Sequence, residues 1–263
     1  MRTIGRVVSL WRYPVKSMCG EELPQAFAGF AGVYGDRFYA FITSAAQKGF
    51  PYLTGREKQE LLLYRPVYRD AEHMKAPPNL PEAEALAPGV TCVYPDAADL
   101  MVDVQTPSGD RLAIDDALLI GMLRQGLRER HELKLARSHR AMTDCRPISL
   151  FSTQTVRQLS RELGAELDKR RFRANVYLDL ESESGFGENA FVGKKLQIGA
   201  KAIVAVVDRD PRCKMITLDP DTAEANPEVM KLVARDHEGK AGVYGAVLIE
   251  GTISPGDSIA LLG

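Results

Sequence analysis

The strongest candidate for chemistry in the sequence is a cysteine that stands among cationic residues. Cys213 follows Arg209 and Arg212 and precedes Lys214, shortly after a strongly apolar stretch. The thiolate form of cysteine is the nucleophile and the metal ligand, and neighbouring cations stabilise that form. A thiolate is also a soft ligand for metals. The segment therefore allows two interpretations: a reactive or metal-binding cysteine, and an inert cysteine that packs as a small apolar side chain.

A second candidate is the basic run Arg170-Arg171-Phe172-Arg173-Ala174-Asn175, which enters a predicted strand. Guanidinium groups can hold a phosphate through paired hydrogen bonds, so the run could form an anion site. Solvated charge at the start of a strand is the alternative interpretation. The residue types alone leave both open.

A third candidate is a glycine pattern. Gly185, Gly187 and Ala190 fit the loose dinucleotide fingerprint G-x-G-x-x-A, and Asp208 follows at the distance expected of a ribose ligand. The fingerprint also requires a helix whose N-terminus faces the pyrophosphate. The residues that follow contain further glycines and alternate like a strand. A plain loop is therefore favoured, and a dinucleotide-dependent enzyme is the weakest of the functional alternatives.

The apolar pattern predicts mostly β-structure around these candidates. Alternating apolar residues predict strands over residues 2–10, 37–42, 175–180, 195–207, 245–250 and 258–262. A helical period predicts helices over 115–127 and 153–164, and the proline-rich residues 71–99 are expected to form a loop or linker. Strands that gather in the second half with few helices between them favour a barrel-like or α+β fold over a doubly wound parallel sheet.

Charge and composition exclude several classes of function. The 263 residues include 34 Lys and Arg against 35 Asp and Glu, so the chain lacks the basic excess of a dedicated nucleic-acid binder. No stretch reaches the roughly 20 apolar residues of a membrane span, and the first residues do not form a secretory signal. The four cysteines are too scattered for a zinc pair or a disulfide scaffold. We therefore expect a cytoplasmic protein with no nucleic-acid partner and no membrane partner.

Five separated segments together resemble one known family. They are Tyr13-Pro14-Val15-Lys16-Ser17, Gly35-Asp36-Arg37-Phe38, Arg171–Asn175, Arg212–Thr222, and Gly242–Gly245 with Gly251–Asp257. They resemble the MOSC family, named after the C-terminal domain of molybdenum cofactor sulfurase, and in particular its amidoxime-reducing molybdenum proteins. The resemblance covers most of residues 4–42 and 140–262. It implies an α+β, predominantly β fold, with a smaller β-barrel-like N-terminal domain over residues 1–115 and a MOSC-type β-barrel domain over residues 116–263.

The same resemblance implies a site for the molybdenum cofactor, which is a molybdopterin with bound molybdenum. Cys213 matches the cysteine that binds the metal and is therefore the expected catalytic residue. The expected cofactor-binding residues are Lys16, Ser17, Arg37, Asp144, Arg173, Asn175 and Arg212. Three cations of this set, Lys16, Arg37 and Arg173, suit the phosphate tail of the cofactor.

The resemblance further implies an oxidoreductase that reduces N-hydroxylated or N-oxide-type small molecules. An iron–sulfur C-x4-C-x2-C pattern is absent from the sequence, so the electrons are expected from a separate ferredoxin- or flavoprotein-type reductase. The alternative is a protein that carries the cofactor or sulfur without turnover of its own. In that case Cys213 would be a persulfide or a docking thiol.

Overall fold

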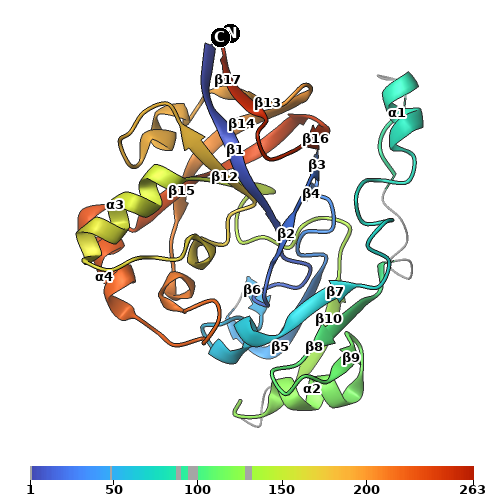
Figure 1. Ribbon diagram of the computed structural model, residues 1–263. Helices are drawn as coiled ribbons and strands as arrows, with labels where there is room; N and C mark the ends of the chain where they lie inside the picture. The colour runs from blue at the N-terminus through green and yellow to red at the C-terminus, as the bar shows by residue number, and fades with distance from the viewer. Residues whose placement is uncertain (1, 48, 87–89, 94–99, 128–131) are drawn as a thin grey trace.

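The computed structural model describes residues 2–47, 49–86, 90–93, 100–127 and 132–263. Its centre is a closed barrel of seven strands (Figure 1). The strands are β1 (Arg2–Arg12), β11 (Ile148–Ser152), β12 (Val176–Leu180), β13 (Lys195–Ile198), β14 (Ala202–Pro211), β15 (Lys240–Ile249) and β17 (Ser258–Leu262). They are hydrogen-bonded in the order β12-β11-β15-β14-β13-β17-β1, and β1 pairs again with β12 to close the ring.

Along each strand of the barrel, side chains that point into the barrel core alternate with side chains that point outward. This alternation allows the strands to close around one apolar core. Leu196 and Ile198 of β13 are buried, as are Val204 and Val206 of β14, and they belong to one apolar core. The pairing of β11 with β12 is parallel, and the other neighbours in the ring are antiparallel. The first strand of the chain thus completes a barrel whose other strands come from residues 148–262.

Three short sheets adjoin the barrel. One joins β5 (Tyr39–Gln47), β6 (Phe50–Tyr52) and β10 (Leu133–Arg137), a second joins β3 (Ala26–Gly29), β4 (Gly32–Val33) and β16 (Gly251–Ile253), and a third joins β7 (Arg65–Tyr68), β8 (Val102–Gln105) and β9 (Arg111–Ala113). The short strand β2 (Glu21–Leu23) pairs with the end of β1. The pairings β5–β10 and β3–β16 cross the domain boundary that we expected at residue 115, and that boundary stays a prediction.

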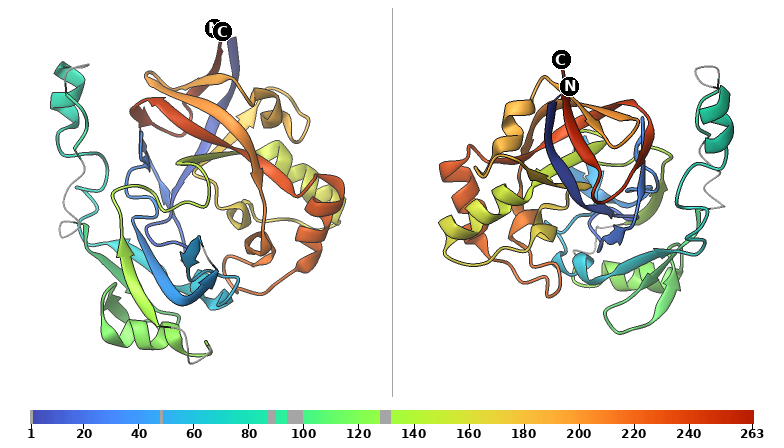
Figure 2. Two further views of the ribbon diagram at one scale, coloured as in Figure 1. Left: turned by 180° about the vertical axis from the view of Figure 1, so that it is seen from behind. Right: turned by 45° about the horizontal axis from the view of Figure 1, so that its top comes forward.

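The described residues form four α-helices: α1 (Leu80–Leu86), α2 (Ala117–Arg124), α3 (Thr153–Leu163) and α4 (Pro227–Asp236). The hydroxyl of Ser152 accepts a hydrogen bond from the backbone N–H of Thr155 at the start of α3, and Gly164 ends it in the left-handed conformation. Helices α3 and α4 lie side by side on one flank of the barrel, where Leu159 and Val229 join a shared apolar core (Figure 2).

The predicted class, α+β with predominant β-structure, is confirmed, but two local predictions are wrong. The run over 195–207 is a hairpin of β13 and β14, because Gly199 turns the chain with a φ of +66° where a side chain would meet the Asp257 carboxylate. The prediction of a loop over 71–99 fails at α1, and residues 87–89 and 94–99 lie outside the described residues. None of the helices described is long and apolar enough to cross a membrane.

Candidate functional site

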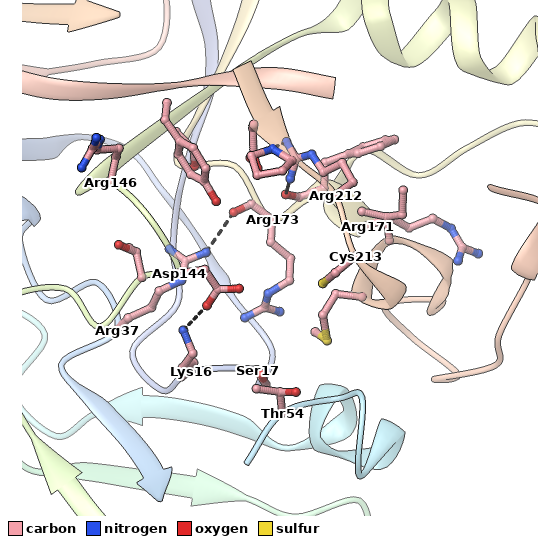
Figure 3. Close-up of a pocket in the computed structure, with 18 of the residues that line it drawn as sticks. Lys16, Ser17, Arg37, Thr54, Asp144, Arg146, Arg171, Arg173, Arg212 and Cys213 are labelled. Atoms are coloured by element: carbon pink, nitrogen blue, oxygen red, sulfur yellow. Dashed lines mark hydrogen bonds and ion pairs between the residues drawn. The ribbon is translucent and has the colours of Figure 1, made fainter. Parts of the chain in front are cut away.

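A pocket lies between the first part of the chain and the end of β14 (Figure 3). The segment after β1 contributes Lys16 and Ser17, the turn before β5 contributes Arg37, and the segment after β14 contributes Arg212 and Cys213. Among the described residues that line the pocket, seven side chains are cationic and two are carboxylates. The pocket therefore has a positive character that the near-neutral net charge of the chain conceals.

Lys16 is held by both its backbone and its side chain. Its backbone N–H donates to the Tyr39 carbonyl at 2.8 Å. Its Nζ atom donates to the Met142 carbonyl at 2.7 Å and forms an ion pair with Asp144 (Figure 3). Burial lowers the pKa of Lys16, although Asp144 opposes this effect. Partial burial disfavours the charged form of Asp144, but Lys16 outweighs it and holds the pKa of Asp144 below its usual value.

Two guanidinium groups contact Tyr13. The guanidinium carbons of Arg37 and Arg173 lie 4.6 and 4.2 Å from the centre of its ring. Arg37 is also paired with Asp36, which is fully buried, and donates to the Arg173 carbonyl at 3.0 Å. Arg173 differs, because its buried Nη2 atom has no hydrogen-bond partner among the described residues and burial lowers its pKa. Figure 3 shows this guanidinium in the middle of the pocket, a position suited to an anion.

Three of the lining residues hold an unusual backbone conformation. Ser17, Arg37 and Arg173 have φ angles of +65°, +50° and +52°, and they are half of the six non-glycine residues with positive φ in the described part of the chain. This region costs a residue with a Cβ about 1–2 kcal/mol. Backbone strain of this kind clusters at ligand sites, where the surrounding structure maintains it. The three side chains therefore reach the pocket at a cost in folding free energy.

The guanidinium of Arg212 is bound by other groups of the protein. Its Nε and Nη1 atoms donate to the carbonyls of Ala241 at 2.7 Å and Phe172 at 2.9 Å, and its guanidinium forms an ion pair with Asp210 at 2.7 Å. Burial raises the pKa of Asp210 to about 6, and Arg212 limits the rise. These contacts fix the end of β14, which leads directly to Cys213.

Cys213 precedes the 3-10 helix η5 (Lys214–Thr217). Its thiol is free and half-buried, and it lines the pocket. No cluster of three or more His, Cys, Asp or Glu that could hold a metal exists within the residues described. The pocket thus offers a metal one thiol ligand beside several cations. This donor set fits a metal group that brings its own further ligands and an anionic tail.

The structure brings together all but one of the predicted site residues. The pocket is lined by Lys16, Ser17, Arg37, Asp144, Arg173, Arg212 and Cys213. Asn175 is absent from this lining. It is buried, accepts hydrogen bonds from the backbone and hydroxyl of Ser149 at 3.2 and 3.1 Å, and donates to the Trp11 carbonyl at 3.3 Å. Because Ser149 does line the pocket, Asn175 supports it from behind.

The glycine pattern at residues 185–190 does not form a dinucleotide site. Residues Gly187–Phe191 form the 3-10 helix η4, and the chain then continues into β13 without an α-helix. Glu188 is fully buried and accepts hydrogen bonds from the hydroxyls of Ser152 and Thr155 at 2.6 and 2.8 Å. The segment therefore supports the start of α3 and lacks the helix N-terminus that a pyrophosphate needs.

Five lining residues with ionisable side chains were not assigned to the site from the sequence: Arg56, Arg146, Arg171, Asp210 and Tyr244. Arg171 and Asp210 adjoin predicted site residues, which is a signal that could have indicated them. Arg171 pairs with Asp219 at 2.8 Å, and in Figure 3 its guanidinium points away from the centre of the pocket. Arg56 and Arg146 are exposed and stand in irregular segments; Arg146 follows the predicted Asp144 by two residues, whereas Arg56 has no predicted site residue near it in the sequence.

Comparisons with known proteins found similar chains among solved structures and among curated proteins. Among solved structures, the YUAD protein from Bacillus subtilis is 13% identical with a TM-score of 0.48, covering 98% of this chain and 96% of that one. YiiM from Geobacillus stearothermophilus is 23% identical with a TM-score of 0.36, covering 45% and 55%. The chain is 25% identical over 251 residues to mitochondrial amidoxime reducing component 2 from Bos taurus, which is 84% of this chain and 69% of that protein.

Two family models match the chain and together cover most of it. The MOSC N-terminal beta barrel domain matches residues 4–108, and the MOSC domain matches residues 137–260. The second match contains the barrel strands that lead to Arg212 and Cys213, and the first contains Lys16, Ser17 and Arg37. The chain therefore belongs to the MOSC family, with the MOSC N-terminal β-barrel domain ahead of the MOSC domain.

Proposed function

We propose that the pocket binds the molybdenum cofactor and that the protein is a molybdenum-dependent oxidoreductase. One observation carries this proposal: a free, half-buried thiol at Cys213 lies in the same cationic pocket as the Arg173 guanidinium, whose Nη2 atom has no hydrogen-bond partner among the described residues. The thiol suits a soft metal ligand and the guanidinium suits a phosphate. The name of the bovine relative, an amidoxime reducing component, supports N-hydroxylated or N-oxide-type small molecules as the substrates.

In this proposal Cys213 binds the molybdenum, and Lys16, Arg37 and Arg173 neutralise the phosphate tail of the molybdopterin. The Ser17 hydroxyl adds a neutral donor and acceptor on the same side. When bound, the cofactor supplies two-electron oxidation and reduction together with transfer of an oxygen atom. The protein supplies binding, orientation and electrostatics.

The remaining predicted residues act through these contacts. Asp144 pairs with Lys16 and keeps its ammonium group at the pocket, and Arg212 fixes the backbone that carries Cys213. Asn175 holds Ser149 in the lining. We propose that the electrons come from a separate ferredoxin- or flavoprotein-type reductase, since no His, Cys, Asp or Glu cluster for a further metal centre occurs in the described part of the chain.

Metal analysis of protein produced in a host that makes molybdopterin tests the proposal. We expect stoichiometric molybdenum in the wild type and turnover of an N-hydroxylated amidine with a chemical reductant. Cys213→Ala is expected to lose most of both, because it removes the thiol ligand. Cys145→Ala is the matched control, since Cys145 is an exposed thiol outside the described lining, and it is expected to leave both unchanged.

The outcomes separate the proposed enzyme from the alternative. Full molybdenum content and full turnover in Cys213→Ala would contradict the ligand assignment. Tightly bound cofactor with no turnover of any N-hydroxylated or N-oxide compound would instead indicate a carrier of the cofactor. A wild-type protein that takes up no molybdenum in a competent host contradicts both.

A further inference from the structure

Tyr244 and Asp210 lie on neighbouring strands beside the pocket, and the proposed function assigns neither a role. Strands β14 and β15 pair antiparallel, with Asp208 opposite Tyr244. The register shifts between Arg209 and Pro211, and at this irregularity Asp210 is buried while Asp208 is exposed. Tyr244 and Asp210 both line the pocket. The Tyr244 hydroxyl lies close enough to the Asp210 carboxyl to stabilise its charge, and the Oδ1 atom of that carboxyl is buried with no hydrogen bond of full geometry among the residues described.

The carboxyl of Asp210 is held in a fixed position. Asp210 is only 2% exposed, and its Oδ2 atom pairs with Arg212 at 2.7 Å. Arg212 is itself bound to two backbone carbonyls and lies over the rings of Phe151 and Phe172. The other carboxylate of the described lining, Asp144, is occupied by Lys16 and is 46% exposed. Asp210 is therefore the carboxyl that water does not reach freely.

The protonation of the pair suits transfer of a proton near neutral pH. Burial raises the pKa of Asp210 to about 6, Asp144 raises it further, and Arg212, the Tyr244 hydroxyl and Arg37 lower it. Burial also raises the pKa of Tyr244, and Asp210 adds to that rise. Tyr244 thus keeps its proton, while Asp210 exchanges its own within the range in which acids and bases work in enzymes.

We propose that the Tyr244 hydroxyl donates a proton to the substrate oxygen that departs during reduction, and that Asp210 positions this hydroxyl and returns its proton. This inference rests on the proposed function. Reduction of an N-hydroxylated compound breaks its N–O bond and consumes two electrons and two protons, giving the amine or amidine and water. The external reductase supplies both electrons. One proton comes from Tyr244 and is replaced through Asp210, and the other comes from solvent.

The reaction kinetics of two conservative variants test the roles. Tyr244→Phe removes only the hydroxyl, so we expect kcat to fall by about 100-fold or more with unchanged molybdenum content and little change in KM. We expect wild-type activity to fall as the pH rises above the Asp210 pKa of about 6, because Asp210 then loses the proton that it returns to Tyr244. Asp210→Asn is expected to lower kcat less than Tyr244→Phe and to abolish this pH dependence. Asp208→Asn, an exposed neighbour on β14, is the control and keeps the wild-type profile.

Infrared spectroscopy of the cofactor-free protein supplies a second readout. A protonated carboxyl absorbs apart from a carboxylate, and we expect one such band to titrate with a midpoint near pH 6. The band should vanish in Asp210→Asn and change frequency in Tyr244→Phe. Normal turnover in Tyr244→Phe, or an Asp210 band whose frequency is unchanged by that substitution, would overturn the proposed proton transfer and leave the proposed function standing. A molybdenum-loaded wild type with no turnover would overturn the proposed function itself.

Discussion

Arg173 and Arg212 line the same pocket, but the protein holds them in opposite ways. Arg212 donates hydrogen bonds to two backbone carbonyls, and its Nη2 atom forms an ion pair with the Asp210 carboxylate at 2.7 Å, although no hydrogen bond of that atom is found among the described residues. Arg173 lies against the ring of Tyr13 and leaves a buried Nη2 atom without a hydrogen-bond partner in the described part of the chain. The comparison shows that the carboxylate partner, which Arg212 has and Arg173 lacks among the described residues, distinguishes the two guanidinium groups better than the residue type or its place in a motif.

The backbone conformation at Arg173 also differs from the backbone conformation at Arg212. Arg173 has a φ of +52°, and Ser17, which also lines the pocket, has a φ of +65°. Arg212 directly follows β14, and Gly242 leaves room for it, since a Cβ there would approach its Nη2 atom to 3.0 Å. The Arg212 region is therefore built to be stable, whereas the Arg173 region accepts strain and an uncompensated charge.

The largest expected effect is the loss of stability in Arg212→Met. The substitution leaves the buried Asp210 carboxyl without its cation, and breaking a buried pair from one side costs about 3–5 kcal/mol. We expect the free energy of unfolding to fall by this amount in urea titrations above the Asp210 pKa of about 6. Arg173→Met is the matched control and is expected to cost less than about 1 kcal/mol, because no carboxylate depends on it. Equal losses in the two variants would contradict the comparison.

The sequence predicts which side chains meet in the pocket better than it predicts how they are held. Lys16, Arg37 and Cys213 stand far apart in the chain, and the resemblance to the MOSC family was sufficient to group them. The same motifs do not separate Arg173 from Arg212, because the partners of Arg212 come from other elements. Asn175 shows the same limit, since its amide faces Ser149 through the pairing of β11 with β12.

Local pattern likewise predicts strands but not their partners. The apolar alternation continues from Ile198 to Ala202 across the turn at Gly199, so two strands resembled one. Strand β1 becomes part of the barrel wall by pairing with β12 and β17. These pairings join distant segments, so no local sequence pattern can predict them. Arg56 enters the lining from an irregular segment, where neither periodicity nor a motif can indicate it.

A smaller effect is expected in anion binding by Arg173→Met. Hydrogen bonds to a charged group contribute about 1.5–3 kcal/mol, so the variant should bind inorganic phosphate roughly 10- to 100-fold more weakly than the wild type. The rise of Tm with phosphate concentration in the cofactor-free protein measures this affinity. Arg235→Met removes a cation whose side chain is 73% exposed on α4, and it should leave the phosphate response unchanged. A wild-type response in Arg173→Met would show that its free donors serve no anion.

The smallest expected effect concerns the backbone strain by which the Arg173 region differs from the Arg212 region. Ser17→Gly removes the Cβ that makes a φ of +65° costly, so the free energy of unfolding should rise by about 1 kcal/mol. Ser17→Ala removes the same hydroxyl and keeps the Cβ, so it isolates the backbone contribution. We expect urea midpoints to rise in the glycine variant alone, while both variants lose the hydroxyl that lines the pocket. If the two midpoints agree, the regions differ in hydrogen bonding but not in strain, and the positive φ angles at the pocket would then be incidental to binding.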